Sequence, residues 1–117
     1  MPRVLLVEDN PIVLEVVRYT LAEAGYAVRG VSDGPSALAA AQEEEPSAVV
    51  LDLKLPGMDG REVLRKLKAT HPRVPVFVFS GRGDSADVVA ELAGVDGCFA
   101  KSADLSPLIR ALGRAVR

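Results

Sequence analysis

The residue types that could do chemistry in this chain are acids, a hydroxyl and a lysine, and each comes directly after a short apolar run. Glu8 and Asp9 follow the first run, Asp52 the third, Ser80 the fourth and Lys101 the fifth. Carboxylates gathered at one place repel one another, and a hard divalent cation held by oxygen ligands relieves that repulsion. The set therefore favours metal-assisted chemistry on a phosphate group.

The three acids could bind such a metal ion. Mg²⁺ prefers oxygen ligands, keeps several waters and usually takes only one or two protein carboxylates. We therefore expect Asp9 and Asp52 to bind Mg²⁺ (or Mn²⁺) directly, and Glu8 to bind it directly or through water. The backbone carbonyl of Lys54, just past Asp52, is expected to complete the site.

With the metal in place, Asp52 is the expected acceptor of a phosphoryl group. A carboxylate can attack phosphorus and form an acyl phosphate. Lys101 would bring a compact positive charge to the phosphoryl oxygens, and the Ser80 hydroxyl could donate a hydrogen bond to another oxygen. An acid after a strand is often a mere helix cap, but Asp52 follows a buried apolar run, where an unpaired carboxylate is costly.

The elements that must bring these residues together are short strands that alternate with amphipathic helices. Runs rich in β-branched residues predict strands, and apolar residues at helical spacing predict helices. The expected strands are Val4–Val7, Val28–Val31, Ala48–Leu53, Val76–Phe79 and Cys98–Ala100. The expected core stripes of the helices are Val13, Val16, Val17, Thr20, Leu21 and Ala24; Val63, Leu64 and Leu67; and Leu108, Ile109, Leu112, Ala115 and Val116.

Local signals mark where the helices begin and end. Asn10 before Pro11 and Ser106 before Pro107 each place a capping side chain ahead of a proline at the first helical position. Asp59 followed three residues later by Glu62 resembles a capping box. Glycines are expected at the ends of the first and fourth helices, where a left-handed residue is needed. They are Gly25 and Gly94.

Strand and helix alternate along the whole chain, which determines the expected fold class. Crossovers between parallel strands are almost always right-handed, so the economical architecture is an open parallel sheet with helices on both faces. Ligands of such sheets bind beyond the carboxyl ends of the strands, where the strand order reverses. The sequence predicts one α/β domain, residues 1–117, with a doubly wound sheet of five parallel strands and five helices.

Composition excludes several classes of function. The net charge of −2, from 14 basic and 16 acidic residues, offers no positive field for direct binding to nucleic acid or to an anionic membrane. Cys98 is the single cysteine and His71 the single histidine, so no soft metal site is expected, and His71 before Pro72 is expected to be solvated. The apolar run to Val7 is too short for a signal sequence or membrane span, and we expect a cytoplasmic protein.

Four motifs in order give the chain its resemblance to a known family. They are Val7-Glu8-Asp9-Asn10, the segment from Asp52 to Gly60 (DLKLPGMDG), Ser80-Gly81, and Lys101. Over essentially its whole length the chain resembles the receiver domains of bacterial two-component response regulators. The resemblance implies the flavodoxin-like strand order 2-1-3-4-5, Mg²⁺ as cofactor, and a histidine kinase or phosphotransfer protein as phosphodonor.

The resemblance also implies a signalling role rather than turnover of a substrate. A receiver transfers the phosphoryl group to itself, at most with slow autodephosphorylation of the acyl phosphate, and is not otherwise an enzyme. Phosphorylation would draw Ser80 and Lys101 inward and change partner binding. The surface implied for a downstream protein or output domain is formed by the helix that ends at Gly94, the strand Cys98–Ala100 and the last helix.

Two positions depart from the family pattern. Cys98 stands where the family usually has an aromatic residue, and Ser102 where it usually has proline after the lysine. Phe99 could supply the missing ring only through a one-residue slip of the strand, so we expect it in the core. The small Cys98 side chain predicts a smaller structural change on phosphorylation than is usual in the family.

Other functions with related chemistry remain to be weighed. A haloacid-dehalogenase-like phosphatase needs a second aspartate two residues after the nucleophile, where this chain has Lys54. A flavodoxin-like carrier would bind phosphate after the first strand, where Glu8 and Asp9 repel it. The serious alternative is a pseudo-receiver, an interaction module that signals without phosphorylation, which Cys98 and Ser102 suggest.

Overall fold

The computed structural model describes residues 1–80, 95–100 and 104–116. The helix expected to end at Gly94 lies outside these residues, as do Lys101 and Ser102. The described elements are β1 (Arg3–Val7), α1 (Pro11–Glu23), β2 (Ala27–Val31), α2 (Gly34–Glu43), β3 (Ala48–Leu51), α3 (Gly60–Thr70), β4 (Val76–Ser80), β5 (Val95–Ala100) and α5 (Ser106–Ala115).

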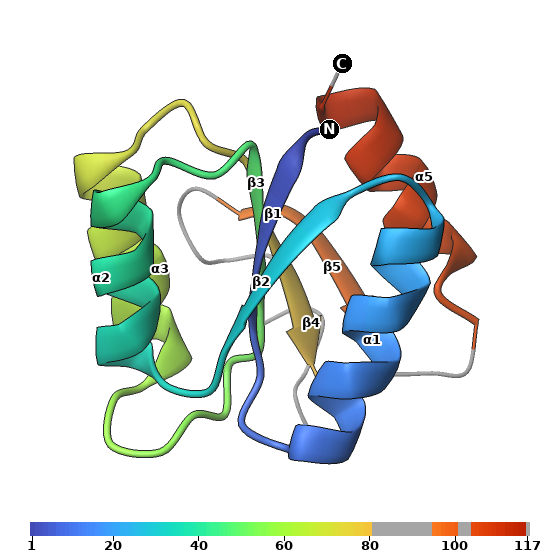
Figure 1. Ribbon diagram of the computed structural model, residues 1–117. Coiled ribbons are helices and arrows are strands. Elements are labelled where there is room, and N and C mark those ends of the chain that lie inside the picture. Colours follow the sequence, from blue (N-terminus) through green and yellow to red (C-terminus); the bar gives the residue numbers. More distant parts are fainter. Residues whose placement is uncertain (81–94, 101–103, 117) are drawn as a thin grey trace.

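The strands form one parallel sheet in the order β2-β1-β3-β4-β5, which confirms the predicted fold class and order. Helices α1 and α5 cover one face of the sheet, and α2 and α3 cover the other (Figure 1). The strand order reverses between β1 and β3, because β2 lies on one side of β1 and all later strands lie on the other. That reversal is where an open sheet of this type offers a site.

The two central strands are buried on both faces, as the sequence predicted. All residues of Val4–Val7 and Ala48–Leu51 are buried. Alternate side chains of each strand contribute to two hydrophobic clusters, one under α1 and α5 and the other under α2 and α3. A charged residue is costly inside a strand that is covered on both faces, and the acids Glu8 and Asp52 come directly after the last residue of β1 and of β3.

Two strand boundaries differ from the prediction by more than one residue. β3 ends at Leu51, two residues early, because Leu53 no longer pairs with a strand and its carbonyl accepts the Gly60 N–H at 3.0 Å. β5 begins at Val95, three residues early, with a bulge opposite Val76. Asp96 occupies that bulge, and Oδ2 of its carboxylate accepts the Val76 N–H at 2.7 Å. Apolar patterning could not show this part of the strand, because an acid and a glycine follow Val95.

Two predicted helix caps are confirmed and two differ: Asp59 caps α3 through the Arg61 N–H rather than in a capping box with Glu62, and Ser106 is not a cap. The Asn10 side chain accepts the N–H groups of Ile12 and Val13, at 2.9 and 3.2 Å, ahead of Pro11. Gly25 has φ +102° at the end of α1, as expected. Ser106 was wrongly taken as a cap: it is the first residue of α5, and its own N–H is accepted by the Asp104 carboxylate at 3.0 Å.

The predicted helical stripes were correct for α3 and correct in part for the other two helices. Val63, Leu64 and Leu67 of α3 are all buried. In α1, Val17 is buried but Val16 is 57% exposed, because at 100° per residue it lies about 60° from Val13, at the margin of the stripe. The predicted stripe residues Ala24 and Ala115 are exposed. Within the described residues, no helix has the length and apolarity that crossing a membrane requires.

Candidate metal centre

The acids lie beside one another because β1 and β3 are neighbours in register. Val7 pairs with Leu51, so the next residue of each strand, Glu8 and Asp52, stands at the same edge of the sheet. The backbone bonding continues one step past the strands, since the Asp52 N–H donates to the Val7 carbonyl and the Glu8 N–H to the Val31 carbonyl, both at 3.0 Å. Both acids are therefore attached to rigid backbone.

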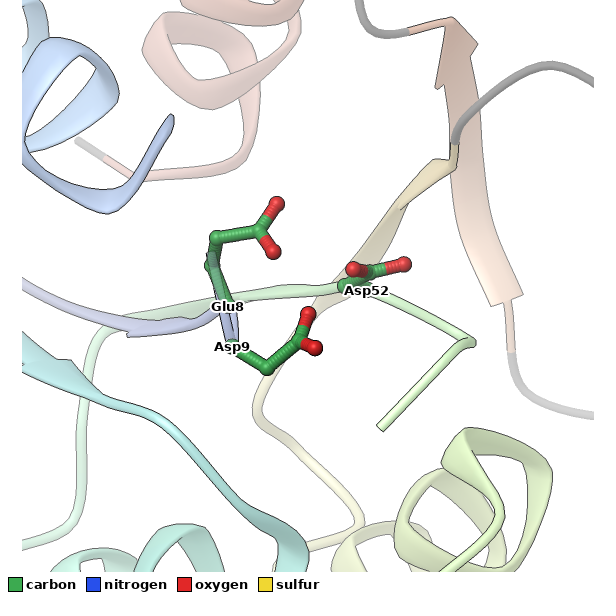
Figure 2. A group of neighbouring side chains, drawn as sticks. All are labelled: Glu8, Asp9 and Asp52. Atoms are coloured by element: carbon green, nitrogen blue, oxygen red, sulfur yellow. The ribbon is translucent and has the colours of Figure 1, made fainter. Parts of the chain in front are cut away.

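Three carboxylates converge at this edge (Figure 2). Glu8, Asp9 and Asp52 each offer an oxygen, and these oxygens all lie within 4.8 Å of one another. Glu8 is fully buried and Asp52 is 3% exposed, whereas Asp9 is exposed. The cluster thus combines two acids inside the protein with one at its surface, so the centre can be reached from solvent through Asp9.

Backbone donors fix the orientation of the two buried acids. Oε2 of Glu8 accepts the Asn10 N–H at 3.0 Å, and Oδ1 of Asp52 accepts the Lys54 N–H at 3.1 Å. In both cases the carboxylate accepts the backbone N–H two residues ahead, and for Asp52 this is the local turn that aspartate side chains favour. Each carboxylate thus accepts a hydrogen bond from the turn that follows its own strand, which helps to orient its oxygens.

This set of donors fits a hard divalent cation. Three carboxylates with oxygens within 4.8 Å carry like charges, two of them inside the protein, where charge without compensation is costly. Oxygen ligands suit Mg²⁺ or Mn²⁺, and the ligands that could hold one are Glu8, Asp9, Asp52 and the Lys54 carbonyl. The structure brings together the three carboxylates that the sequence predicted for the metal, and the role of the Lys54 carbonyl stays a prediction.

A surface groove leads away from this cluster, past residues that the prediction did not include. It is lined by Asp9, Leu53, Lys54, Leu55, Pro56, Asp59 and Arg61. Asp59 is the N-cap of α3 and accepts the Arg61 N–H at 2.9 Å, so its main role is structural, as its place before the helix indicated. Arg61 could have been found from its position directly after Gly60, in the first turn of that helix.

Comparison with known proteins determines the family. Residues 4–113 match the model of the response regulator receiver domain. The chain belongs to this family. A relative is the transcriptional regulatory protein KdpE of Mycobacterium tuberculosis, 41% identical over 118 residues, which cover 100% of this chain and 52% of KdpE. The receiver domain thus spans about half the length of the curated relatives it matches.

Solved structures share the fold of this receiver domain. A two-component response regulator of the LuxR family from Aurantimonas is 33% identical, with a TM-score of 0.86 over 97% of this chain and 84% of that one. The response regulator TrrA of Thermotoga maritima, in complex with Mg²⁺ and BeF, has a TM-score of 0.90 over 99% of this chain and 100% of its own. Its 23% identity shows the fold alone.

The remaining predicted site residues of the receiver domain fall at or beyond the limit of the described part. The Ser80 backbone is the last of β4 and pairs with Ala100, the last of β5. The Ser80 side chain and the whole of Lys101 lie outside the described residues, so their roles stay predictions. The strand ends that carry them do stand at the same edge of the sheet as Asp52.

The residue at the aromatic position of this receiver domain lies where the sequence placed it. Cys98 pairs with Val78 and packs, half-buried, against the small cluster of Leu53 and Val78. Phe99 points to the opposite face, where its ring lies 6.1 Å from that of Phe77 and packs, partly buried, against the core. The strand has therefore not slipped to bring Phe99 into the position of Cys98.

Proposed function

We propose that this receiver domain is a phosphoacceptor switch of a two-component system, with Asp52 as the acceptor in a Mg²⁺-dependent reaction and residues 1–117 as one domain. The observation that carries the proposal is the cluster of Glu8, Asp9 and Asp52, whose oxygens lie within 4.8 Å of one another at the strand-order reversal. Family membership supports it.

The chain's own residues supply the nucleophile. The Lys54 N–H holds Oδ1 of Asp52, so the carboxylate is oriented before a phosphodonor arrives. A carboxylate oxygen forms the new bond to phosphorus while the bond from phosphorus to the donor's imidazole nitrogen breaks, and the electron pair stays on that nitrogen. Mg²⁺ held by Glu8, Asp9, Asp52 and the Lys54 carbonyl would supply positive charge against the carboxylates and the phosphoryl oxygens.

Two further residues complete the proposed site. The Lys101 ammonium would pair with a phosphoryl oxygen, and the Ser80 hydroxyl would donate a hydrogen bond to another. Formation of these contacts is the difference between the two states of the switch, because only differential contacts can shift a population. Apart from self-phosphotransfer and slow hydrolysis of the acyl phosphate, we propose no enzymatic activity.

The proposed partners follow from the family. The phosphodonor is a histidine kinase or a phosphotransfer protein, and the output is a downstream protein or domain that contacts the face of β5 and α5 together with the helix expected before Gly94. Relatives such as TcrX of Mycobacterium tuberculosis are named probable transcriptional regulatory proteins, and this chain matches 49% of that relative's length. Such an output is therefore a proposal for the longer protein.

Intact mass tests the acceptor. The protein is mixed with Mg²⁺ and acetyl phosphate, and we expect one phosphoryl group on the wild type and none on Asp52→Asn. Asp33→Asn is the matched control, because Asp33 also follows a strand and caps a helix but lies outside the cluster. If the wild type takes no phosphoryl group from acetyl phosphate or from a cognate kinase, the chain is instead a phosphorylation-independent interaction module.

A further inference from the structure

Helix α3 begins directly against the backbone that follows Asp52. Gly60, its first residue, is buried. A Cβ atom on Gly60 would lie 2.5 Å from the Leu53 Cα, 2.6 Å from the Leu53 carbonyl oxygen and 2.8 Å from the Asp52 carbonyl oxygen. All three atoms belong to the main chain, which cannot turn aside as a side chain can. Only glycine allows the helix to approach this closely.

The close approach forms a short chain of hydrogen bonds that ends at the acceptor. The Gly60 N–H donates to the Leu53 carbonyl at 3.0 Å. The nitrogen of the same peptide unit, that of Lys54, donates its hydrogen to Oδ1 of Asp52 at 3.1 Å. The Leu53–Lys54 peptide unit therefore makes two hydrogen bonds. Its carbonyl oxygen accepts the Gly60 N–H, and its N–H donates to the Asp52 carboxylate. Hydrogen bonds linked in this way polarise one another.

Another residue of the β3–α3 loop, Met58, lies against the first residue of α2. At Gly34, the first residue of α2, a Cβ would lie 3.0 Å from both Cβ and Sδ of Met58, and 2.8 Å from Cγ2 of Val63. These are side-chain atoms, and a methionine adapts its shape readily. Gly60 therefore meets main-chain atoms of the loop, whereas Gly34 meets only side-chain atoms.

We infer that Gly60 is a positioning residue for the metal centre: by fixing the Leu53–Lys54 peptide it orients the Asp52 carboxylate and the following Lys54 carbonyl. The inference rests on the proposed function. It predicts an effect on selectivity, because Mg²⁺ demands near-octahedral geometry at about 2.0–2.1 Å whereas Ca²⁺ accepts irregular ligands at about 2.3–2.6 Å. A shifted peptide therefore weakens Mg²⁺ binding more than Ca²⁺ binding.

The test compares Gly60→Ala with Gly113→Ala. Gly113 lies in α5, and a Cβ there meets nothing within 4 Å, so it controls for the substitution itself. Amide chemical shifts are followed while Mg²⁺ or Ca²⁺ is added to each protein. Because loss of a group that orients a metal ligand costs about 10- to 100-fold in affinity, we expect that loss for Mg²⁺ in Gly60→Ala. The loss for Ca²⁺ should be markedly smaller, and Gly113→Ala should match the wild type.

The outcomes separate this inference from the proposed function. If the wild type binds no Mg²⁺, both fail. If the wild type binds Mg²⁺ and Gly60→Ala keeps the same affinities, or loses Mg²⁺ and Ca²⁺ binding equally, only the positioning role of Gly60 is overturned. A purely structural role would lower the melting temperature of Gly60→Ala without changing the ratio of the two affinities.

The wild type gives a second measurement if Gly60→Ala does not fold. During the Mg²⁺ titration the Gly60 and Lys54 amide signals should shift with one common midpoint, because both donate to the same hydrogen-bonded chain. The Gly25 amide, which donates to the Ala22 carbonyl at the far end of α1, should stay in place. If the Lys54 amide signal shifts on addition of Mg²⁺ and the Gly60 amide signal does not, the inference is overturned.

Discussion

The two ends of the sheet treat charge in opposite ways. At the carboxyl end, one carboxylate oxygen from each of three acids lies within 4.8 Å of the others. At the amino end, acids lie beside cations: the Lys68 ammonium binds Asp96 at 2.9 Å, and the Arg3 guanidinium binds Glu44 at 2.7 Å. The amino end pairs acids with cations, whereas the carboxyl end gathers three acids, whose mutual repulsion a bound cation would reduce.

His71 also lies at the amino end. The prediction that its side chain is solvated was wrong. Its ring nitrogen Nδ1 lies 2.9 Å from Oε2 of Glu45, and its side chain is 12% exposed. The backbone explains the position, because His71 caps α3 and its N–H donates to the Leu67 carbonyl at 2.7 Å. A loop signature such as His-Pro does not show that the loop folds back against another segment.

The largest effect is expected from adding metal to the acidic end. A ligand that binds only the folded state at 100 times its Kd stabilises it by about 2.7 kcal/mol. Mg²⁺ should therefore raise the free energy of unfolding, measured by urea denaturation, in the wild type and in Asp96→Asn. The gain should be strongly reduced in Asp52→Asn. Equal gains in all three proteins would place the Mg²⁺ site elsewhere.

The second effect concerns the acid at the opposite end. Asp96→Ala removes the acceptor of the Val76 N–H and the partner of Lys68, and Val76 is fully buried. An unsatisfied buried donor costs about 2 kcal/mol, and we expect that loss in urea denaturation. Asp96→Asn keeps an acceptor oxygen and is the control, with a smaller loss. A stability of Asp96→Ala within about 0.5 kcal/mol of the wild type would contradict the structural role.

The third effect has the opposite sign. Without metal, Asp9→Asn removes one of three like charges, and two charges about 4 Å apart in water repel by about 1 kcal/mol. We therefore expect Asp9→Asn to be more stable than the wild type by about 1 kcal/mol in EDTA. Salt at 1 M should reduce the gain, because it screens exposed charges. A loss of stability would show that Asp9 has a favourable partner and that the two ends do not differ as stated.

The smallest effect comes from an acid outside both clusters. The Ser36 N–H, 2.7 Å from Oδ1 of Asp33, lowers the pKa of Asp33 below its usual range. A depressed folded-state pKa means that the charged form contributes stability at neutral pH, and that this contribution is lost as the pH falls through the folded pKa. An NMR titration should give a midpoint below the usual 3.8, and Ser36→Pro, which has no N–H, should raise it.

Sequence patterns could predict the sheet and the identity of the acids because both depend on local information. Buried central strands read as apolar runs, and an acid directly after such a run must stand at the strand end. Asn10 and Gly25 were predicted because a cap depends only on neighbouring backbone. Ser106 was mispredicted because α5 begins one residue earlier than expected, with Leu105 at the N-cap position and the Asp104 carboxylate accepting the Ser106 N–H.

The sequence by itself determined the fold class, the acids after β1 and β3, and the family resemblance, since residue types and spacing within one segment carry that information. The tertiary structure alone decided how close the carboxylates lie, that α3 rests on the backbone after Asp52 at Gly60, and that Asp96 bulges out to hold Lys68 and Val76. The first and third features depend on contacts between segments far apart in the chain, and the second depends on the path of the loop between β3 and α3. No local pattern encodes such a distance, and packing of the whole sheet sets it.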